Sequence, residues 1–409
     1  ARKRARRAAP AHLGAAAAAA TRPARATPVP GAAELKQLES LHHDPTAPAR
    51  NVDWLLLVAA GALSVLGAAM VFSTTKGAGA SADTSYLGRE IVFLLLSVVV
   101  LAVTALVDYR RLRELTPAVY LVTLFLLGGV LVLGTNIKGA QAWYAFGPFQ
   151  LQPSEPAKIA LIVTLASVLS AQRHRLDGLR LVVVLVLAGV PMGLILLQPD
   201  LGTCLVFVTV TLGMLVTAGV RVRYLVGLLL VGVVGVVAVL NSGMLADYQR
   251  DRLTVFLTGA EGASARREAY NIEQSETAIS LGGVRGWGFG SGPQTQAGFV
   301  PEQETDFIFT AVGEELGFVG AAGLLVLFGV VATRTLRSAQ LARDDFGALL
   351  CIGVLVMLAF QLFQNVGMTM GIMPITGIPL PFVSYGGSSL LTTWAAVGLV
   401  LNVRMRRFR

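Results

Sequence analysis

Charged residues are scarce in this sequence, and so are the cysteines and histidines of many catalytic and metal sites. Only 14% of the 409 residues are charged and 54% are hydrophobic, with two cysteines and four histidines in all. The mean hydropathy of +0.67 is too high for a soluble domain. The composition therefore predicts an all-α polytopic membrane protein.

Ten apolar runs are long enough to cross a bilayer as helices, which takes about 20 residues each. They cover residues 53–73, 90–107, 115–133, 154–171, 180–197, 201–219, 224–240, 306–333, 346–366 and 385–403. Arginines gather after the second, fourth, sixth, eighth and tenth runs. Because basic residues concentrate in cytoplasmic loops, both termini are predicted to be cytoplasmic.

The two largest segments outside these runs differ in character. Residues 1–50 are rich in alanine, proline and arginine without apolar periodicity, which predicts a disordered basic cytoplasmic tail before a membrane domain at 51–409. Residues 241–305 are predicted to form a large extracytoplasmic loop between helices 7 and 8, and such long loops are usually functional. The net charge of +9 follows from topology, so contact with membrane lipids is expected and no nucleic acid partner is.

The extracytoplasmic side lacks histidine and cysteine altogether. All four histidines fall in cytoplasmic segments, and Cys204 and Cys351 lie inside predicted spans. A His/Cys metal cluster, a Ser-His-Asp triad and a disulfide framework are therefore excluded on that side. A general base there must be a carboxylate, and a fixed cation must be arginine, lysine or an oxygen-bound metal such as Mg²⁺.

Polar residues gather first around the predicted start of the fourth span. Lys138 and Trp143 precede the segment LQPSEPAK, which contains Glu155 and Lys158. The last two lie three residues apart, so they share a helix face and can form an ion pair. A structural ion pair at a helix end and a functional role explain them equally well, since charges in a membrane are costly.

A second polar grouping lies in the long loop. Arg252 and Arg285 have the chemistry to hold a diphosphate, and Gln274 lies between them in YNIEQSETAISLGG. The glycines that follow allow a ligand to approach the backbone closely. No strand precedes them, so a dinucleotide-binding fold is excluded.

The third grouping, FVPEQETDFIFTAVGEELG at 299–317, brings several carboxylates to the mouth of a span. Thr305 is a suitable N-cap, which places Asp306 in the first helical turn. Charge at the edge of a membrane is costly and usually functional, so Asp306 is the first candidate for chemistry. Glu314 and Glu315 follow about 12 to 13 Å along the helix and are expected to be a deeper structural or gating pair.

Five segments, taken together and in order, resemble the signature of the SEDS family, whose members include RodA and FtsW. These segments are QPSEPAK, QPDLGT, YNIEQSETAISLGG, FVPEQETDFIF with GEELG, and GIPLPFVSYGGSS. The resemblance runs from about residue 52 to the C-terminus. YNIEQS with GPQTQ is closer to the RodA branch, which implies a role in cell elongation and shape maintenance.

The resemblance implies a peptidoglycan glycosyltransferase at the bacterial cytoplasmic membrane. Such an enzyme polymerises lipid II on the outer face, releases undecaprenyl diphosphate and works with a class B penicillin-binding protein. By motif, Asp306 is similar to the family's essential aspartate. The positions that match residues around the family's outer cavity are Lys138, Trp143, Glu155, Lys158 and Arg252. Ala142 departs from the family, because members often have arginine there.

Glycan polymerisation needs a base for the attacking hydroxyl and cations for the leaving diphosphate. We assign Asp306 as the base and place Arg252, Lys138, Lys158 and possible Mg²⁺ on the diphosphate. Further candidates for substrate contact are Gln274, Arg285, Glu302, Thr305 and Ser384.

Two other functions compete with this interpretation. A lipid II flippase would share the spans and buried charges, although no inverted repeat is evident in the sequence. A non-catalytic scaffold for a penicillin-binding protein would give the extracytoplasmic carboxylates no function. Polymerisation of purified lipid II separates the enzyme from both.

Overall fold

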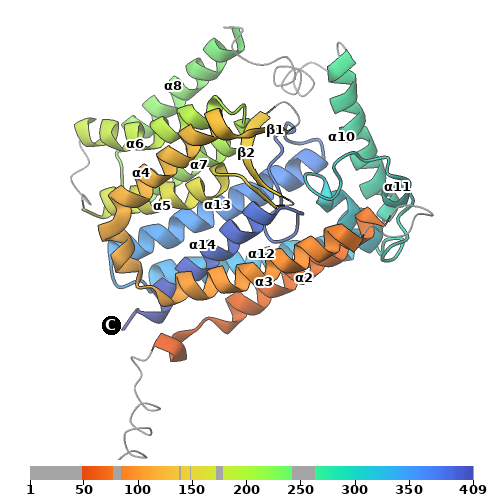
Figure 1. The fold of residues 1–409 in the computed structure, drawn as a ribbon, viewed down its shortest axis with the longest axis horizontal. Helices are drawn as coiled ribbons and strands as arrows, with labels where there is room; N and C mark the ends of the chain where they lie inside the picture. Colours follow the sequence, from red (N-terminus) through yellow and green to blue (C-terminus); the bar gives the residue numbers. More distant parts are fainter. Residues whose placement is uncertain are drawn as a thin grey trace, which may run out of the picture. The chain divides into compact units, whose positions relative to one another are not determined.

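Each of the ten predicted runs coincides with a helix in the computed structural model (Figure 1). The structure describes residues 48–76, 84–137, 140–147, 149–171, 178–241 and 263–408. The ten helices are α2 (Trp54–Thr75), α3 (Thr84–Leu106), α4 (Tyr109–Leu133), α5 (Ser154–Ala171), α6 (Gly178–Leu196), α7 (Leu201–Thr217), α8 (Val222–Asn241), α12 (Ile308–Gln340), α13 (Asp345–Thr369) and α14 (Gly387–Met405). A short 3₁₀ turn, η1 (Pro48–Asn51), precedes them. The predicted tail lies almost entirely outside the described residues.

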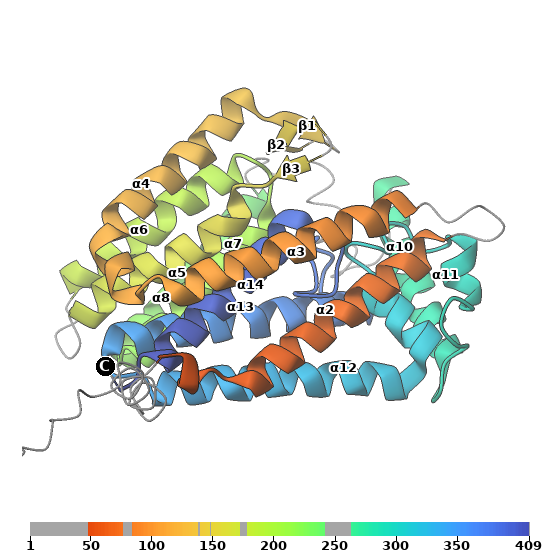
Figure 2. The ribbon, with the colours of Figure 1, turned by 60° about the horizontal axis from the view of Figure 1, so that its bottom comes forward.

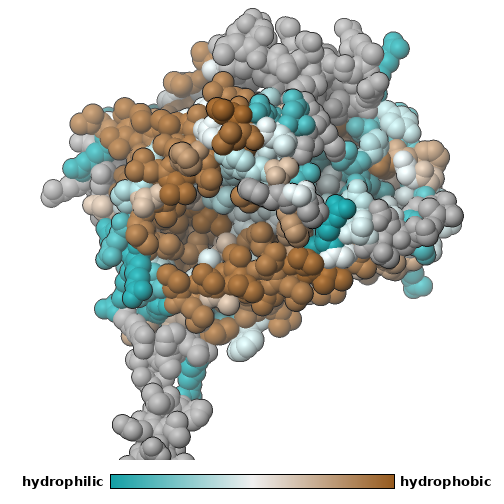
Figure 3. Space-filling model, viewed as in Figure 1, coloured by the Kyte–Doolittle hydropathy of each residue, from teal (hydrophilic) through white to brown (hydrophobic). Residues whose placement is uncertain are grey.

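Among the described helices, seven are long and apolar enough to cross a membrane, which confirms a polytopic membrane protein. They are α2, α3, α4, α5, α6, α12 and α13. Helix α7 and part of α8 are apolar but shorter. Side chains such as Val98 and Val99 on α3, and Val122 and Phe125 on α4, point outward. The outer surface over α3 and α4 is correspondingly apolar, as expected of a surface facing lipid (Figure 3).

The prediction of an all-α fold misses a small antiparallel sheet between α4 and α5. Its strands are β1 (Thr135–Ile137), β2 (Ala140–Phe146) and β3 (Phe149–Leu151), in that order. Thr135 pairs with Trp143, and Tyr144 pairs with Leu151. Strands β1 and β3 have three residues each, too few to show a period of two, and β2 lies in a glycine-rich polar segment between two apolar runs.

The segment 241–305 is likewise not a plain loop. Its described part holds α10 (Ala263–Gly282) and the short α11 (Pro293–Ala297). On α10, the Ser275 hydroxyl lies 2.6 Å from that of Thr310 and donates to the carbonyl of Thr369. Helix α10 is therefore part of the packed structure, and it holds the residues on either side of Gln274 against α12 and α13.

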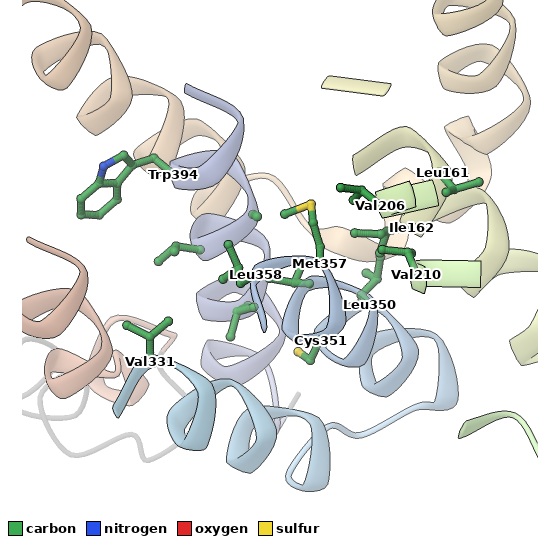
Figure 4. Close-up of a cluster of buried hydrophobic side chains, with 14 of the residues drawn as sticks. Leu161, Ile162, Val206, Val210, Val331, Leu350, Cys351, Met357, Leu358 and Trp394 are labelled. Carbon is green, nitrogen blue, oxygen red and sulfur yellow. The ribbon is translucent and has the colours of Figure 1, made fainter. Parts of the chain in front are cut away.

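The hydrophobic core lies where α13 packs among α5, α7, α12 and α14 (Figure 4). Ile162, Val210, Leu350, Met357 and Val331 are buried there. Helix α2 joins this core through close backbone contact, since a Cβ added at Gly67 would lie 2.6 Å from Cα of Val383. The core thereby fixes the loop before α14, which forms one wall of the candidate site.

Helix α12 is broken at Gly317, which has φ 63° and ψ −164°. The turn at 283–288 fills the break, because Phe318 N–H donates to Gly283 and Gly288 N–H donates to Glu315. A Cβ at Gly317 would lie 2.3 Å from the nitrogen of Gly286. Both the backbone angles and the contact therefore require glycine.

We expect Gly317→Ala to destabilise the protein by about 1 to 3 kcal/mol or more, because the side chain strains the backbone and meets the inserted turn. Gly323→Ala is the matched control, since Gly323 lies within α12 and nothing lies within 4 Å of its added Cβ. Thermal unfolding in detergent measures both. Equal melting temperatures for the two variants would contradict the assignment.

Candidate functional site

Asp306 lies in a turn before α12 rather than in its first helical turn. The helix begins at Ile308 with Phe307 as N-cap and no side-chain capping bond, so the prediction that Thr305 caps it is wrong. The backbone N–H of Asp306 donates to Glu302, and its carbonyl accepts a 2.8 Å hydrogen bond from Asn365 Nδ2. The peptide is thus held on both sides while the half-buried side chain stays at the surface of the turn.

The loop before α14 is fastened to this turn. The Ser384 hydroxyl accepts from Leu380 N–H at 2.8 Å and donates to the carbonyl of Thr305 at 2.5 Å. Tyr385 N–H donates to Glu304 at 2.9 Å. Ser384 is only 4% exposed, so positioning the turn accounts for this residue. Its predicted contact with substrate stays a prediction.

The same loop is fastened at its other end to the start of α5. The Ser388 hydroxyl accepts from Gln152 N–H at 3.0 Å and donates to the carbonyl of Gln150 at 3.2 Å. Gln152 and Ser154 in turn donate to Asp200. Two groupings that are about 150 residues apart in the sequence are therefore connected through residues 384–388.

Glu155 and Lys158 form the predicted ion pair, with 2.8 Å between Lys158 Nζ and Glu155 Oε1. Both side chains are about 95% buried or more. Glu155 Oε2 is buried without a hydrogen-bond donor among the described residues. Burial makes this more than an interfacial pair, because removing one partner leaves an uncompensated charge.

Sequence reasoning missed Arg89, which lies near the extracytoplasmic end of α3 as we orient it. Its guanidinium lies 5.6 Å from the ring centre of Tyr86 and is close enough to Tyr385 to hydrogen-bond its hydroxyl. Burial raises the pKa of Tyr385, and the nearby Arg89 charge lowers it in part. The side chain of Arg89 is exposed. Arg89 lies just before the predicted span 90–107 and belongs to none of the three polar groupings in the sequence.

Glu314 and Glu315 are fully buried and hydrogen-bonded within the protein. Glu314 accepts from the N–H groups of Gln294 and Thr295 at 2.7 and 2.9 Å, which caps α11. Glu315 accepts from Ser73 Oγ at 2.6 Å, two residues before the end of α2. Both residues precede the break at Gly317 and lie in the helical segment that begins at Ile308, as their spacing predicts. A structural or gating role for the pair stays a prediction.

The remaining candidates are scattered around this site. Trp143 is half-buried on β2, beside the buried Ala142, and Gln274 is half-buried on α10. Arg285 is exposed in the turn that fills the break in α12, and Glu302 is exposed at φ 54°. Lys138 and Arg252 lie outside the described residues.

The described side chains do not form a protein cage for a divalent ion. Within them, no group of three or more His, Cys, Asp or Glu residues is placed to hold a metal. Mg²⁺ commonly takes only one or two protein carboxylates together with water and substrate phosphate. A role for Mg²⁺ therefore stays a prediction, and no step below depends on it.

Two cavities flank the site without containing Asp306. One of about 370 Å³ lies between α12 and α13 and is lined by apolar side chains such as Phe328, Leu358 and Phe363. The other, of about 400 Å³, has Arg266, Tyr270, Asn271 and Pro301 among its lining residues. Pro301 of the second cavity lies next to the acidic turn that carries Asp306, and Val366 of the first lies next to Asn365, which bonds Asp306.

A family model described as a cell cycle protein, which covers FtsW, RodA and SpoVE, matches residues 52–408. The chain belongs to this family. A probable peptidoglycan glycosyltransferase FtsW of Geobacter metallireducens is 36% identical over 361 residues, which are 87% of this chain and 95% of the relative. The peptidoglycan glycosyltransferase MrdB of Escherichia coli K12 is 34% identical over 369 residues, which are 90% and 95%.

A solved structure supports the same membership. It is described as a peptidoglycan synthase complex that coordinates polymerization and crosslinking, and a chain in it is 33% identical with a TM-score of 0.75. The match covers 88% of this chain and 99% of that one. The relatives named FtsW and MrdB match at nearly the same identity, so identity does not separate the branches of the family.

We expect Glu155→Gln to lower stability by roughly 3 to 5 kcal/mol, because Lys158 is then buried without its partner. The double variant Glu155→Met/Lys158→Met is expected to recover most of that loss, since an apolar pair of similar size replaces both charges. Thermal unfolding of the purified variants tests this. A single variant as stable as the wild type would show that Lys158 has another partner.

Proposed function

We propose that this protein polymerises lipid II into glycan strands at the outer face of the bacterial cytoplasmic membrane. Membership in a family whose curated relatives are named peptidoglycan glycosyltransferases makes the chain a glycosyltransferase. The observation that carries the proposal is the anchored acidic turn, in which Asp306 is held between Glu302 and Asn365. Lipid II is both donor and acceptor, and undecaprenyl diphosphate leaves.

Asp306 is the proposed general base. It accepts the proton of the acceptor hydroxyl as the hydroxyl oxygen attacks the anomeric carbon of the donor. Its peptide is held rigidly, and Gly377 leaves room for the carboxylate, since a Cβ there would lie 3.3 Å from Asp306 Oδ2. Because the base is already held in place, no conformational entropy is lost in positioning it during the reaction.

Among the described residues, Arg89 and Lys158 are the cations that we propose to hold the diphosphate. Tyr385 connects Arg89 to the acidic turn, and Ser388 connects that loop to the helix of Lys158. An arginine guanidinium binds phosphate strongly, because it can donate two parallel hydrogen bonds to two phosphate oxygens.

The proposed topology has ten spans, cytoplasmic termini and an extracytoplasmic site. The strands, α10 and α11 lie at one end of the helices, and the C-terminus lies with the start of α2 at the other (Figure 2). The second end carries Arg334, Arg337, Arg404 and Arg407. Basic residues favour the cytoplasmic side, so the Asp306 end faces outward.

We further propose a class B penicillin-binding protein as partner and a role in cell elongation. The solved relative works in a synthase complex that couples polymerization to crosslinking, which supports the partner. YNIEQS and GPQTQ support the elongation branch. Depletion separates the roles, because loss of elongation synthesis rounds rod-shaped cells whereas loss of division synthesis produces filaments.

Asp306→Asn is expected to abolish polymerisation and to leave folding unchanged, because the amide has the size of the carboxylate but cannot accept the proton. Polymer formed from purified lipid II, together with the melting temperature, measures both. Glu273→Gln is the matched control, since Glu273 is an exposed carboxylate on α10. A near wild-type polymer yield from Asp306→Asn would contradict the assignment of Asp306 as the base.

The same preparation, placed in vesicles, separates the alternatives. Lipid II flipping without polymer would support a flippase, and polymer only after a penicillin-binding protein with its own polymerase is added would support a scaffold. Polymer from the wild-type protein without flipping supports the enzyme.

Arg89→Gln is expected to lower kcat/KM for polymerisation by roughly 10- to 100-fold, the range for losing a hydrogen-bonded charge. Arg89→Lys keeps the charge and should recover part of the rate. Arg113→Gln, at the opposite end of the helices, is the control. A wild-type rate for Arg89→Gln would remove Arg89 from the mechanism.

A further inference from the structure

A second charged cluster lies at the end of the helices remote from Asp306. It is built on Asp53, the N-cap of α2, which is 2% exposed. Asp53 and Ser73 are separated by about 30 Å along α2, at ~1.5 Å per residue, which is the thickness of the hydrocarbon core. Since Ser73 contacts Glu315 beside the candidate site, the cluster belongs to the opposite membrane surface.

Two arginines from different helices converge on this one carboxylate. Arg334 Nε of α12 lies 3.1 and 3.0 Å from the two oxygens of Asp53. Arg404 Nη1 of α14 lies 3.0 Å from Oδ2, but the geometry does not make a hydrogen bond. The hydrogens of this largely buried nitrogen therefore lack a well-aligned acceptor. One carboxylate serves two guanidinium groups.

Two further arginines extend the cluster. Arg337 follows Arg334 by three residues on α12 and so shares its helix face, and Arg407 lies in the turn just past the end of α14. Both Arg337 and Arg407 are close enough to Arg404 for their charges to repel it. Arg407 Nη2 donates to Asn51 Oδ1 at 3.1 Å, while its Nε is buried without an acceptor among the described residues.

Among the described residues, nearby carboxylates do not balance these charges. Asp108 lies 3.7 Å from Arg406, and Asp344 accepts from Tyr109 and caps α13. Arg334 and Arg404 share Asp53, while Arg337 and Arg407 have no carboxylate partner within the described part of the chain, which leaves three positive charges. Part of this surplus is buried, and burying cations without anions is costly. Bidentate, charge-assisted bonding to phosphate is the ordinary use of grouped arginines.

We propose that Arg334, Arg337, Arg404 and Arg407 form a phosphate-binding site for an anionic lipid headgroup of the cytoplasmic leaflet. The site lies where three membrane-associated helix ends meet, at the start of α2 and the ends of α12 and α14 (Figure 2). Basic pockets of this kind between helix ends bind anionic headgroups. A bound headgroup would hold α2, α12 and α14 together on the side opposite the chemistry.

Binding of phosphatidylglycerol to the full, delipidated protein, measured by native mass spectrometry in detergent, tests the site. Arg337→Gln is expected to weaken binding about five-fold, the effect of one basic residue near a lipid surface. Arg337 is exposed and has no ion pair or hydrogen bond among the described residues, so the variant should fold. Arg337→Lys should bind nearly as the wild type does.

Arg113→Gln is the matched control, since Arg113 is an exposed arginine on α4 at the same end. An equal loss for Arg113→Gln and Arg337→Gln would overturn the site, because a general surface field would then explain the binding. Phosphatidylcholine should not compete. Competition by inorganic phosphate would show a phosphate site also open to free phosphate, and binding of neither phosphatidylglycerol nor phosphate would overturn the proposal.

Discussion

The structure depends on hydrogen bonds to the N–H and C=O groups of its non-helical backbone, because the surroundings of the protein offer few partners for them. Residues 377–386 are not helical, yet they lie against the core. Ser384, Tyr385 and Asn365 provide the bonds that water would provide in a soluble protein. The same bonds hold the turn of Asp306, so the requirement that keeps this loop folded also positions the proposed base.

Buried charge imposes a second constraint, and the chain meets it differently at each place. Lys158 has a single carboxylate, while Glu314 and Glu315 are neutralised by backbone dipoles and hydroxyl groups. At the other end of the helices, Asp53 is outnumbered by arginines. A buried charge with a partner is consistent with a structural role, whereas a surplus of positive charge is consistent with a bound anion. This difference supports different functions for the two ends of the helices.

Several features were predictable from local patterns. The apolar runs gave the positions of ten helices, because hydrophobic length and composition are properties of contiguous sequence. The ion pair of Glu155 and Lys158 followed from spacing on one helix. The break at Gly317 was not predictable from spacing, because it depends on a turn that arrives from residues 283–288.

The sequence by itself determined the membrane class and the family, and it suggested a carboxylate as the base, since each rests on residue types or contiguous motifs. Only the tertiary structure decided that Ser384 clamps the acidic turn, that Arg89 lies near Tyr385, and that two arginines from different helices share one aspartate. Hydrogen bonds and ion pairs between distant segments depend on how helices pack. That packing is a property of the whole chain, which no local pattern records.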